Sequence, residues 1–291
     1  MLDGLLVVDK PAGFTSHDVV ARIRRIVAQK KVGHAGTLDP DATGVLLVGL
    51  GRVTRLLRFL QAESKEYRGT VVFGTATDTL DASGRVVARR EMTIDREEIG
   101  RAVEALTGDI EQVPPMVSAV QVGGRRLHAI AREGREVDRP ARPVTVHRFD
   151  IVDLDPGPPP VADIEVECGS GTYVRSLAAD LGAALGGPAH LGSLRRTRVG
   201  EFTLDDAVTL DTIAADPRAS LRPPVDALRH LPRVVVDADG AAHVAVGRPL
   251  AVGEWQGTPG DGPVAVLDDC GLLIAVYDVE GDTLRPSVVL K

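Results

Sequence analysis

The sequence is poor in cysteine, and its cysteines form no recognisable pattern. Cys168 and Cys270 lie far apart in the chain and have no partners at metal-ligand spacing. This excludes a disulfide framework and argues against a zinc site. We expect both thiols to be small buried apolar groups.

Long apolar segments are also lacking. No run approaches the roughly 20 residues of a membrane-spanning helix, and the N-terminus lacks the basic, apolar and small-residue order of a signal peptide. We therefore expect a cytoplasmic protein with no membrane partner. The length of 291 residues and the hydrophobic content of 44% predict a substantial core, in one large domain or a domain with an appendage.

The chain has no overall excess of positive charge. Its formal net charge of -7 argues against a generic nucleic-acid binder. The charges are uneven, however, because residues 20–68 carry ten Lys or Arg against four acids and residues 226–291 carry five against ten. A basic face and an acidic C-terminal segment would allow an RNA partner. A merely solvated basic helix is the alternative.

Residues 31–44 (Lys-Val-Gly-His-Ala-Gly-Thr-Leu-Asp-Pro-Asp-Ala-Thr-Gly) stand out because glycine and proline interrupt any regular element. We expect a loop, with Asp39 at its centre and Pro40 biasing Asp39 towards an extended backbone. An Asx or type I turn without function is an equally good local interpretation. The loop lacks the ending and spacing of a phosphate-binding motif, which excludes that class.

Residues 33–40, with Ala42-Thr43-Gly44 after them, resemble the signature loop of the TruB family of tRNA pseudouridine synthases. The aspartate of that loop is the family's catalytic nucleophile, so the resemblance implies this role for Asp39. Asp41 is the neighbouring competitor. The resemblance implies that His34 stacks or hydrogen-bonds in the gap left in the RNA loop. The alternative is a neutral histidine near a turn, without this role.

Two segments on either side of this loop resemble further motifs of the family. The first is Asp-Lys-Pro-x-Gly-x-Thr-Ser from residue 9, whose lysine, here Lys10, lies near the active site. The second is Lys-x-Tyr at 65–67, whose aromatic ring, here Tyr67, stacks on the target uracil. Without the resemblance, a tyrosine in a strand is more commonly a core residue with a satisfied hydroxyl.

Gly-Thr-Tyr-Val-Arg at 171–175 resembles the motif whose arginine pairs with the nucleophile and whose tyrosine lines the uracil pocket. The resemblance implies these roles for Arg175 and Tyr173. Helical periodicity places Arg175 at the edge of an apolar stripe, from which it can point out of the core. The motif at 190–198 implies that Leu194 contacts the base.

Four arginines are candidates for contact with RNA. Arg195 and Arg196 follow Leu194 in a basic strand, and Arg125 and Arg126 follow two glycines in the segment 120–150. We expect that segment to be a basic lobe that closes on RNA, with a surface hairpin of no function as the alternative. Val117 stands where the family often has tyrosine.

The order of strand and helix patterns predicts an α+β protein, with Ser16 capping the helix that follows it. The resemblance implies a pseudouridine-synthase catalytic domain with a mixed, mainly antiparallel sheet over residues 1–224. Short strands from Val225 on predict a small β-rich, PUA-like domain over residues 225–291.

The implied reaction isomerises uridine 55 in the T-loop of tRNA to pseudouridine. It involves no net redox change, so we expect no cofactor and no metal. The expected partner is the T-arm of tRNA, bound by a monomer that needs no protein partner. A tRNA-folding factor without required catalysis is the main alternative, and a guide-RNA-dependent relative within a complex is a third.

Overall fold

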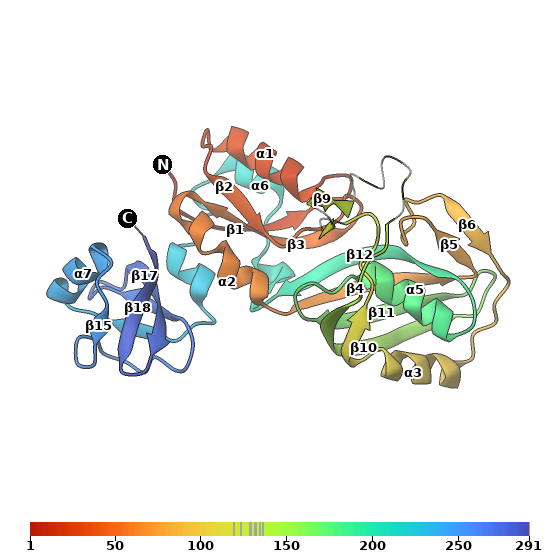
Figure 1. The fold of residues 1–291 in the computed structure, drawn as a ribbon. Coiled ribbons are helices and arrows are strands. Elements are labelled where there is room, and N and C mark those ends of the chain that lie inside the picture. The colour runs from red at the N-terminus through yellow and green to blue at the C-terminus, as the bar shows by residue number, and fades with distance from the viewer. Residues whose placement is uncertain are drawn as a thin grey trace.

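A large sheet and a small sheet, with helices packed on them, form an elongated molecule (Figure 1). The computed structural model describes residues 1–118, 120–122, 124–127, 130, 133, 135 and 137–290, without the side chains of Val122 and Arg126. Within this part, every helix is too short or too polar to cross a membrane.

The large sheet has nine strands in the order β1-β3-β12-β4-β11-β10-β7, with β2 paired to β3 and β13 paired to β12. Its strands are β1 (Gly4–Lys10), β2 (Val32–Ala35), β3 (Thr43–Leu50), β4 (Lys65–Phe73), β7 (Gly108–Gln112), β10 (Arg142–Asp155), β11 (Val161–Cys168), β12 (Ala189–Val199) and β13 (Phe202–Thr203). Neighbouring strands are antiparallel except β3 and β12, which run parallel. This parallel contact joins the N-terminal strands to the rest of the sheet.

Helices pack on the large sheet and, in the case of α7, on the small sheet. They are α1 (Ser16–Ile26), α2 (Leu57–Ala62), α3 (Arg96–Ala105), α5 (Val174–Ala184), α6 (Leu210–Ala215) and α7 (Ala238–Ala245), with 3-10 turns η1 (Gly51–Arg55), η2 (Leu204–Asp206) and η3 (Pro224–Leu228). Helices α3 and α5 lie over β10 to β12, and α1 and α6 lie beside β1 and β2 (Figure 1). Short paired strands complete the fold: β5 (Thr75–Thr77) with β6 (Val86–Arg89), and β8 (Gln121–Val122) with β9 (Arg125–Arg126).

The cap of α1 differs from the prediction. Thr15, not Ser16, is the N-cap, because Thr15 and Asp18 form a capping box in which each side chain accepts from the other residue's backbone N–H. Ser16 is buried instead. Its hydroxyl accepts from the N–H of Leu38 at 2.9 Å and donates to the carbonyl of Leu38 at 3.3 Å. The helix start therefore holds the segment that carries Asp39.

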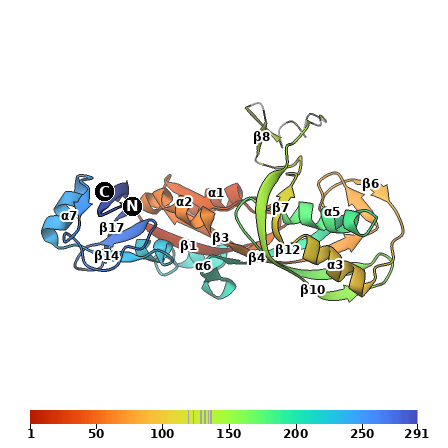
Figure 2. The ribbon, with the colours of Figure 1, turned by 60° about the horizontal axis from the view of Figure 1, so that its bottom comes forward.

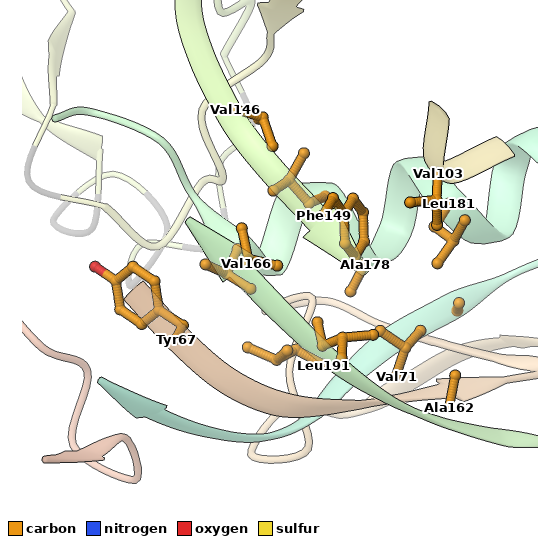
Figure 3. Close-up of a cluster of buried hydrophobic side chains, with 14 of the residues drawn as sticks. Tyr67, Val71, Val103, Val146, Phe149, Ala162, Val166, Ala178, Leu181 and Leu191 are labelled. Atoms are coloured by element: carbon orange, nitrogen blue, oxygen red, sulfur yellow. The ribbon is translucent and has the colours of Figure 1, made fainter. Parts of the chain in front are cut away.

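An apolar cluster between the large sheet and helices α3 and α5 forms the main core. Val71, Phe149, Val166 and Leu181 are buried there. Figure 3 shows Tyr67 at the edge of this cluster, with its hydroxyl oxygen directed away from the apolar side chains. The core thus fixes the ring of Tyr67 while leaving its polar end outside.

The small sheet at the C-terminal end has the strand order β14-β16-β17-β18-β15. Its strands are β14 (Arg233–Val235), β15 (Leu250–Ala251), β16 (Val264–Leu267), β17 (Leu273–Glu280) and β18 (Thr283–Val289). Val276 and Val288 join an apolar cluster with Leu5 and Leu56, so this sheet packs directly on the larger one. The predicted fold class is confirmed: a mixed, mainly antiparallel sheet precedes a β-rich C-terminal unit. The domain boundary at 224/225 stays a prediction.

Cys270 was wrongly predicted to be buried. Cys168 is buried in the main core, whereas Cys270 lies exposed in the turn between β16 and β17. The neighbouring Asp268 accepts backbone hydrogen bonds there, as acidic residues commonly do in turns.

The segment 31–44 is not irregular throughout, because its first part forms β2. Val32 pairs with Leu50 and Ala35 pairs with Leu47, and the loop proper is confined to residues 36–42. Gly44 then allows β3 to meet β12. It has φ +101°, and a Cβ at this position would lie 2.1 Å from the carbonyl oxygen of Arg196. Only glycine fits this contact.

We predict that Gly44→Ala destabilises the protein by about 3 kcal/mol, since alanine adds both strain at positive φ and a clash with backbone. Gly186→Ala is the matched control. Gly186 also has positive φ (+77°), but a Cβ there meets nothing within 4 Å. Gly186→Ala should lower the free energy of unfolding by only about 1 kcal/mol. Urea unfolding of both variants measures the difference, and equal losses would remove the clash from the explanation.

Candidate active site

Hydrogen bonds hold the loop from residue 36 to residue 42 on both sides of Asp39. Ser16 binds the backbone of Leu38, and the N–H of Gly13 donates to the carbonyl of Pro40 at 3.0 Å. Since the residues before and after Asp39 are both tied to the segment following β1, the backbone of Asp39 is fixed. Its side chain is 39% exposed.

Lys10 reinforces this support from a fully buried position. Its Nζ donates to the carbonyls of Pro11 (3.0 Å), Phe14 (2.5 Å) and Pro40 (2.9 Å), which uses all three protons of the ammonium group. Burial lowers the pKa of Lys10 to about 8, although the charges of Asp41 and Asp39 oppose the shift. Lys10 thus anchors the loop through the carbonyl of Pro40.

Arg196, which lies on β12, binds backbone groups at both ends of this loop. Its guanidinium is almost completely buried and donates from Nε to Val45 (2.7 Å), from Nη2 to Gly36 (3.2 Å) and from Nη1 to Thr37 (3.5 Å). All three acceptors are backbone carbonyls. Among the described residues, no carboxylate forms an ion pair with Arg196. Its positive charge therefore remains uncompensated next to the loop.

Asp39 pairs with Arg175, the second residue of α5. Nε of Arg175 lies 3.0 Å from Oδ2 of Asp39, and Nη2 donates to Oδ1 at 3.3 Å. The guanidinium thus contacts both carboxylate oxygens, one through an ion pair and one through a charge-assisted hydrogen bond. The Arg175 side chain is only 5% exposed. Its position at the edge of the apolar stripe of α5 therefore does not expose it to solvent.

The rest of the Arg175 guanidinium is also occupied. Nη1 donates to the carbonyl of Thr79 at 2.9 Å, and Nη2 donates to that of Val117 at 2.8 Å. Asp81 provides a second carboxylate, 3.6 Å from Nη1. Two separate segments, residues 79–81 and Val117, therefore orient Arg175 towards Asp39.

The pKa of Asp39 is raised above its ordinary value. The main cause is burial, which disfavours the charged carboxylate, and the negative charge of Asp81 acts in the same direction. The guanidinium of Arg175, followed by the ammonium of Lys10, opposes the shift. The pair therefore holds an ionisable carboxylate that is poorly solvated and fixed in direction.

A cavity of about 360 Å³ opens beside this pair. It brings together seven residues singled out from the sequence: His34, Asp39, Tyr67, Tyr173, Arg175, Leu194 and Arg196. A larger cavity, of about 850 Å³, lies beside α1 and contains Lys10 and Arg195 but not Asp39. We take the smaller cavity as the candidate active site, because it contains the carboxylate–guanidinium pair.

The walls of the candidate site come from strands and a helix start. Tyr67 lies on β4, and Leu194 lies opposite Gly69 on the neighbouring β12. Burial raises the pKa of the Tyr67 hydroxyl, against the influence of Arg196, so the phenol stays protonated. Tyr173 caps the start of α5, where the side-chain amide of Gln112 binds both its N–H and its carbonyl.

His34 lies on β2 at the rim of the cavity. Its ring meets that of His17 edge to face, with centroids 5.2 Å apart. Burial lowers the pKa of His34, and the positive charges of His17 and Arg196 lower it further. Within the described part of the chain, its buried Nδ1 has no hydrogen-bond partner. His34 is therefore a neutral ring whose Nδ1 is available for a hydrogen bond with a ligand.

Lys65 also lines the cavity, although the sequence analysis assigned it no role. It is buried, and its Nζ donates to the carbonyls of Gln61 (2.6 Å) and Glu63 (2.5 Å) at the end of α2. Burial lowers its pKa to about 8. Strand alternation was the available signal, because it places residue 65 on the same face as Tyr67.

The other RNA-contact candidates do not line the cavity with Asp39. Arg195 forms a two-point ion pair with Asp9 (3.0 and 2.8 Å). Arg125 pairs with Glu133, on the β8–β9 ribbon that projects from the body (Figure 2). The side chain of Arg126 lies outside the described residues, as does part of the predicted lobe. RNA contacts by these arginines stay predictions.

Two family models match most of the chain. Residues 24–174 match the TruB family pseudouridylate synthase (N terminal domain), and residues 175–231 match the tRNA pseudouridylate synthase B C-terminal domain. The boundary between these matches falls at Arg175, within the site.

Similar proteins match over nearly the full length. The chain is 50% identical to tRNA pseudouridine synthase B of Rhodococcus jostii (strain RHA1), a match that covers 99% of this chain and 94% of that protein. It is 46% identical to tRNA pseudouridine synthase B of Arthrobacter sp. (strain FB24), with 99% and 97% coverage.

A solved structure also matches. The H/ACA RNP bound to a substrate RNA containing 2'-deoxyuridine contains a chain with a TM-score of 0.76 and 26% identity, which covers 99% of this chain and 85% of that one. Together with the family models and the full-length relatives, this likeness shows that the chain belongs to the TruB family of pseudouridylate synthases.

Proposed function

We propose that this protein converts uridine 55 in the T-loop of tRNA to pseudouridine, with Asp39 as the nucleophile. Its family membership makes it an isomerase that acts on uridine in tRNA. The observation that carries the finer proposal is the two-point contact between Asp39 and Arg175 at the wall of a cavity. The tRNA-folding alternative needs RNA binding but not this pair.

The reaction requires a carboxylate beside the sugar or the base. The bond between N1 and C1' breaks, the uracil turns, and a bond between C5 and C1' forms. The proton leaves C5 and a proton is gained at N1, so the atoms balance without a redox partner. Asp39 attacks either C1' or C6, and both routes begin from the ionised carboxylate.

Arg175 supports this chemistry by orientation and by charge. Its two-point contact directs the oxygens of Asp39 along the cavity wall and favours the ionised form against the cost of burial. Asp81 and the two backbone carbonyls hold the guanidinium in place. We therefore assign Arg175 to the positioning of the nucleophile.

The cavity is suited to one uridine turned out of its RNA. A volume of about 360 Å³ lies within the usual range for small-ligand pockets. The rings of Tyr67 and Tyr173 and the side chain of Leu194 would enclose the base, and stacking on an aromatic ring offsets part of the cost of unstacking it. His34 lies at the rim, where the rest of the RNA loop would pass.

We predict that Asp39→Asn lowers the rate of pseudouridine formation more than about a thousandfold while tRNA binding is largely retained. Asparagine keeps the size of the side chain but removes the nucleophile. Asp41→Asn is the control, because Asp41 is exposed and two residues away. Tritium release from C5-labelled uridine in tRNA measures the rate. The reverse pattern, an inactive Asp41 variant beside an active Asp39 variant, would overturn the assignment.

We predict that kcat/KM falls with decreasing pH at a pKa above the ordinary Asp value of 3.8, because the folded-state pKa of Asp39 is raised. Activity is present above this pKa and is lost as Asp39 takes up a proton. Arg175→Gln should move the acid limb to higher pH, because it removes the largest opposing charge. Arg175→Lys keeps the positive charge and should move the acid limb less. An acid limb at the same pH in all three proteins would contradict this account.

We predict that Tyr67→Leu lowers the rate by about tenfold or more, as loss of base stacking does, with a smaller effect on stability. Val71→Ala is the matched control, since Val71 lies on the same strand, fully buried in the same cluster. It should lower the thermal midpoint but not the rate of the folded protein. A Tyr67 variant that behaves like the Val71 variant would restore the interpretation as a core residue.

A further inference from the structure

Lys65 is a buried cation in the wall of the candidate active site, and the proposed function gives it no task. It is the first residue of β4 and lines the same cavity as Asp39. Its Nζ donates to the carbonyls of Gln61 and Glu63, which engages two of the three protons of an ammonium group. Among the described residues, Nζ has neither a third acceptor nor a carboxylate partner. Because a buried charge without a counter-charge is costly, the third proton calls for a ligand.

Lys65 lies next to the ring that would hold the uracil. Lys65 and Tyr67 are two residues apart on β4 and both are buried, so their side chains lie on the same face of the sheet. Tyr67 directs its hydroxyl oxygen away from the apolar cluster (Figure 3). Arg196 is paired with Tyr67 across β12 and β4 and lines the same cavity. The Tyr67 ring therefore has one buried cation beside it along the strand and another across the sheet.

The isomerisation makes the uracil transiently anionic. When the bond between N1 and C1' breaks, its electron pair stays on the uracil and spreads over N1, O2 and O4. If Asp39 first attacks C6, negative charge develops on O4 before that bond breaks. In both routes the charge disappears when the bond between C5 and C1' forms, the C5 proton leaves and N1 gains a proton. A donor aimed at a uracil carbonyl therefore acts on the transition state more than on the bound substrate.

The two arginines in the cavity wall are largely engaged by the protein itself. Arg175 contacts both oxygens of Asp39 and donates to two backbone carbonyls. Arg196 donates to three backbone carbonyls of the loop and β3. Lys65 differs, because it keeps one ammonium proton beyond its two carbonyl partners. It is therefore the cation best placed to donate to a ligand.

We infer that Lys65 is a further catalytic residue, whose ammonium group donates to a carbonyl oxygen of the uracil and stabilises the negative charge that develops as the bond between N1 and C1' breaks. The inference rests on the proposed function, because it takes the occupant of the cavity to be a uridine. Its task differs from those of Asp39, which supplies the nucleophile, and Arg175, which orients it. A fixed donor in a site shielded from water contributes about a hundredfold or more to such a rate.

The charge of Lys65 depends on four features of its surroundings. Burial lowers the pKa of Lys65 to about 8 and Arg196 on β12 lowers it further, whereas Cys168 on β11 and Glu63 before β4 oppose the shift. Lys65 is therefore protonated below about pH 8 and neutral above it. A neutral amine still has two protons, which suffice for the carbonyls of Gln61 and Glu63. Deprotonation thus removes the donor to the uracil and leaves the anchoring of α2 intact.

The first test replaces Lys65 in the full chain and uses an unmodified tRNA transcript as substrate. We expect Lys65→Met to lower kcat for pseudouridine formation about a hundredfold and to change the Kd of the transcript by less than about threefold, because the uracil becomes anionic only after binding. Lys65→Arg keeps the charge and the donors and should restore most of the rate. Tritium release from C5-labelled uridine measures kcat, and filter binding measures Kd.

The second test compares proteins over a range of pH. The ratio of wild-type kcat/KM to that of Lys65→Met should be constant below about pH 8 and fall by about tenfold per pH unit above it, since the wild type then loses the charge that the variant lacks. This ratio cancels the titration of groups that both proteins share. Leu60→Ala is the matched control, because it removes a buried apolar contact of α2 and no charge. Its ratio to the wild type should be the same at every pH.

A pH-independent ratio for Lys65→Met, or a loss confined to Kd, would overturn the inference and leave Lys65 as an anchor of α2. Should Lys65→Met fail to fold, the ratio of wild type to Lys65→Arg serves instead, because arginine stays charged where lysine does not. That ratio should also fall above about pH 8, and a constant value would contradict the catalytic role.

Wild-type activity separates this inference from the proposed function. An active wild type together with an unchanged kcat in Lys65→Met removes only the role of Lys65. A wild type that forms no pseudouridine at uridine 55 overturns the proposed function, and the role of Lys65 with it.

Discussion

The site depends on a positive charge buried beneath its loop. Arg196 donates to three backbone carbonyls, two of them in the loop and one in β3, and its own backbone occupies the space that a side chain at position 44 would need. Burial lowers the pKa values of Lys10, His34 and Lys65, and the charge of Arg196 lowers each of them further. An unpaired buried cation is costly unless something anionic offsets it. RNA, the polyanionic substrate proposed for this cavity, would supply such a charge.

The same positive environment explains how an acidic protein can act on RNA. The negative charge is concentrated in the C-terminal part, where residues 226–291 carry five bases against ten acids, and several surface arginines are paired with carboxylates. Arg196, which forms no ion pair with a described carboxylate, lines the cavity of Asp39, and Arg24, Arg55 and Arg58 line a neighbouring space. Local distribution, and not the total charge, decides which surface attracts nucleic acid.

Much of the fold followed from the sequence, because apolar alternation and helical periodicity are local signals. The α+β class was predicted, and the helix expected after Ser16 is observed from Ser16 to Ile26. The loop around Asp39 was also found, but its first residues form β2, since pairing with β3 outweighs the low strand propensity of glycine. The roles of Ser16 and Lys65 were missed, because their partners are backbone groups that no sequence pattern identifies.

The meeting of Asp39 with Arg175 could be expected only from the family resemblance. The two residues are 136 positions apart in the chain, and nothing local brings them together. Periodicity placed Arg175 at the edge of an apolar stripe, which was correct for the helix, but it could not show a buried side chain directed into a cavity. Such contacts are set by the parallel pairing of β3 with β12 and by the packing of α5 on β12, which are tertiary features.

The partners of Arg175 also bear on how the protein matures. Its guanidinium is held by Asp39, Asp81 and the carbonyls of Thr79 and Val117, so a ribosome-bound chain that has not yet emerged as far as α5 has the carboxylate without its orienting group. With Asp39 as the proposed nucleophile, a chain without α5 lacks the guanidinium that orients this carboxylate. The complete pair requires that segments 136 positions apart in the chain have come together.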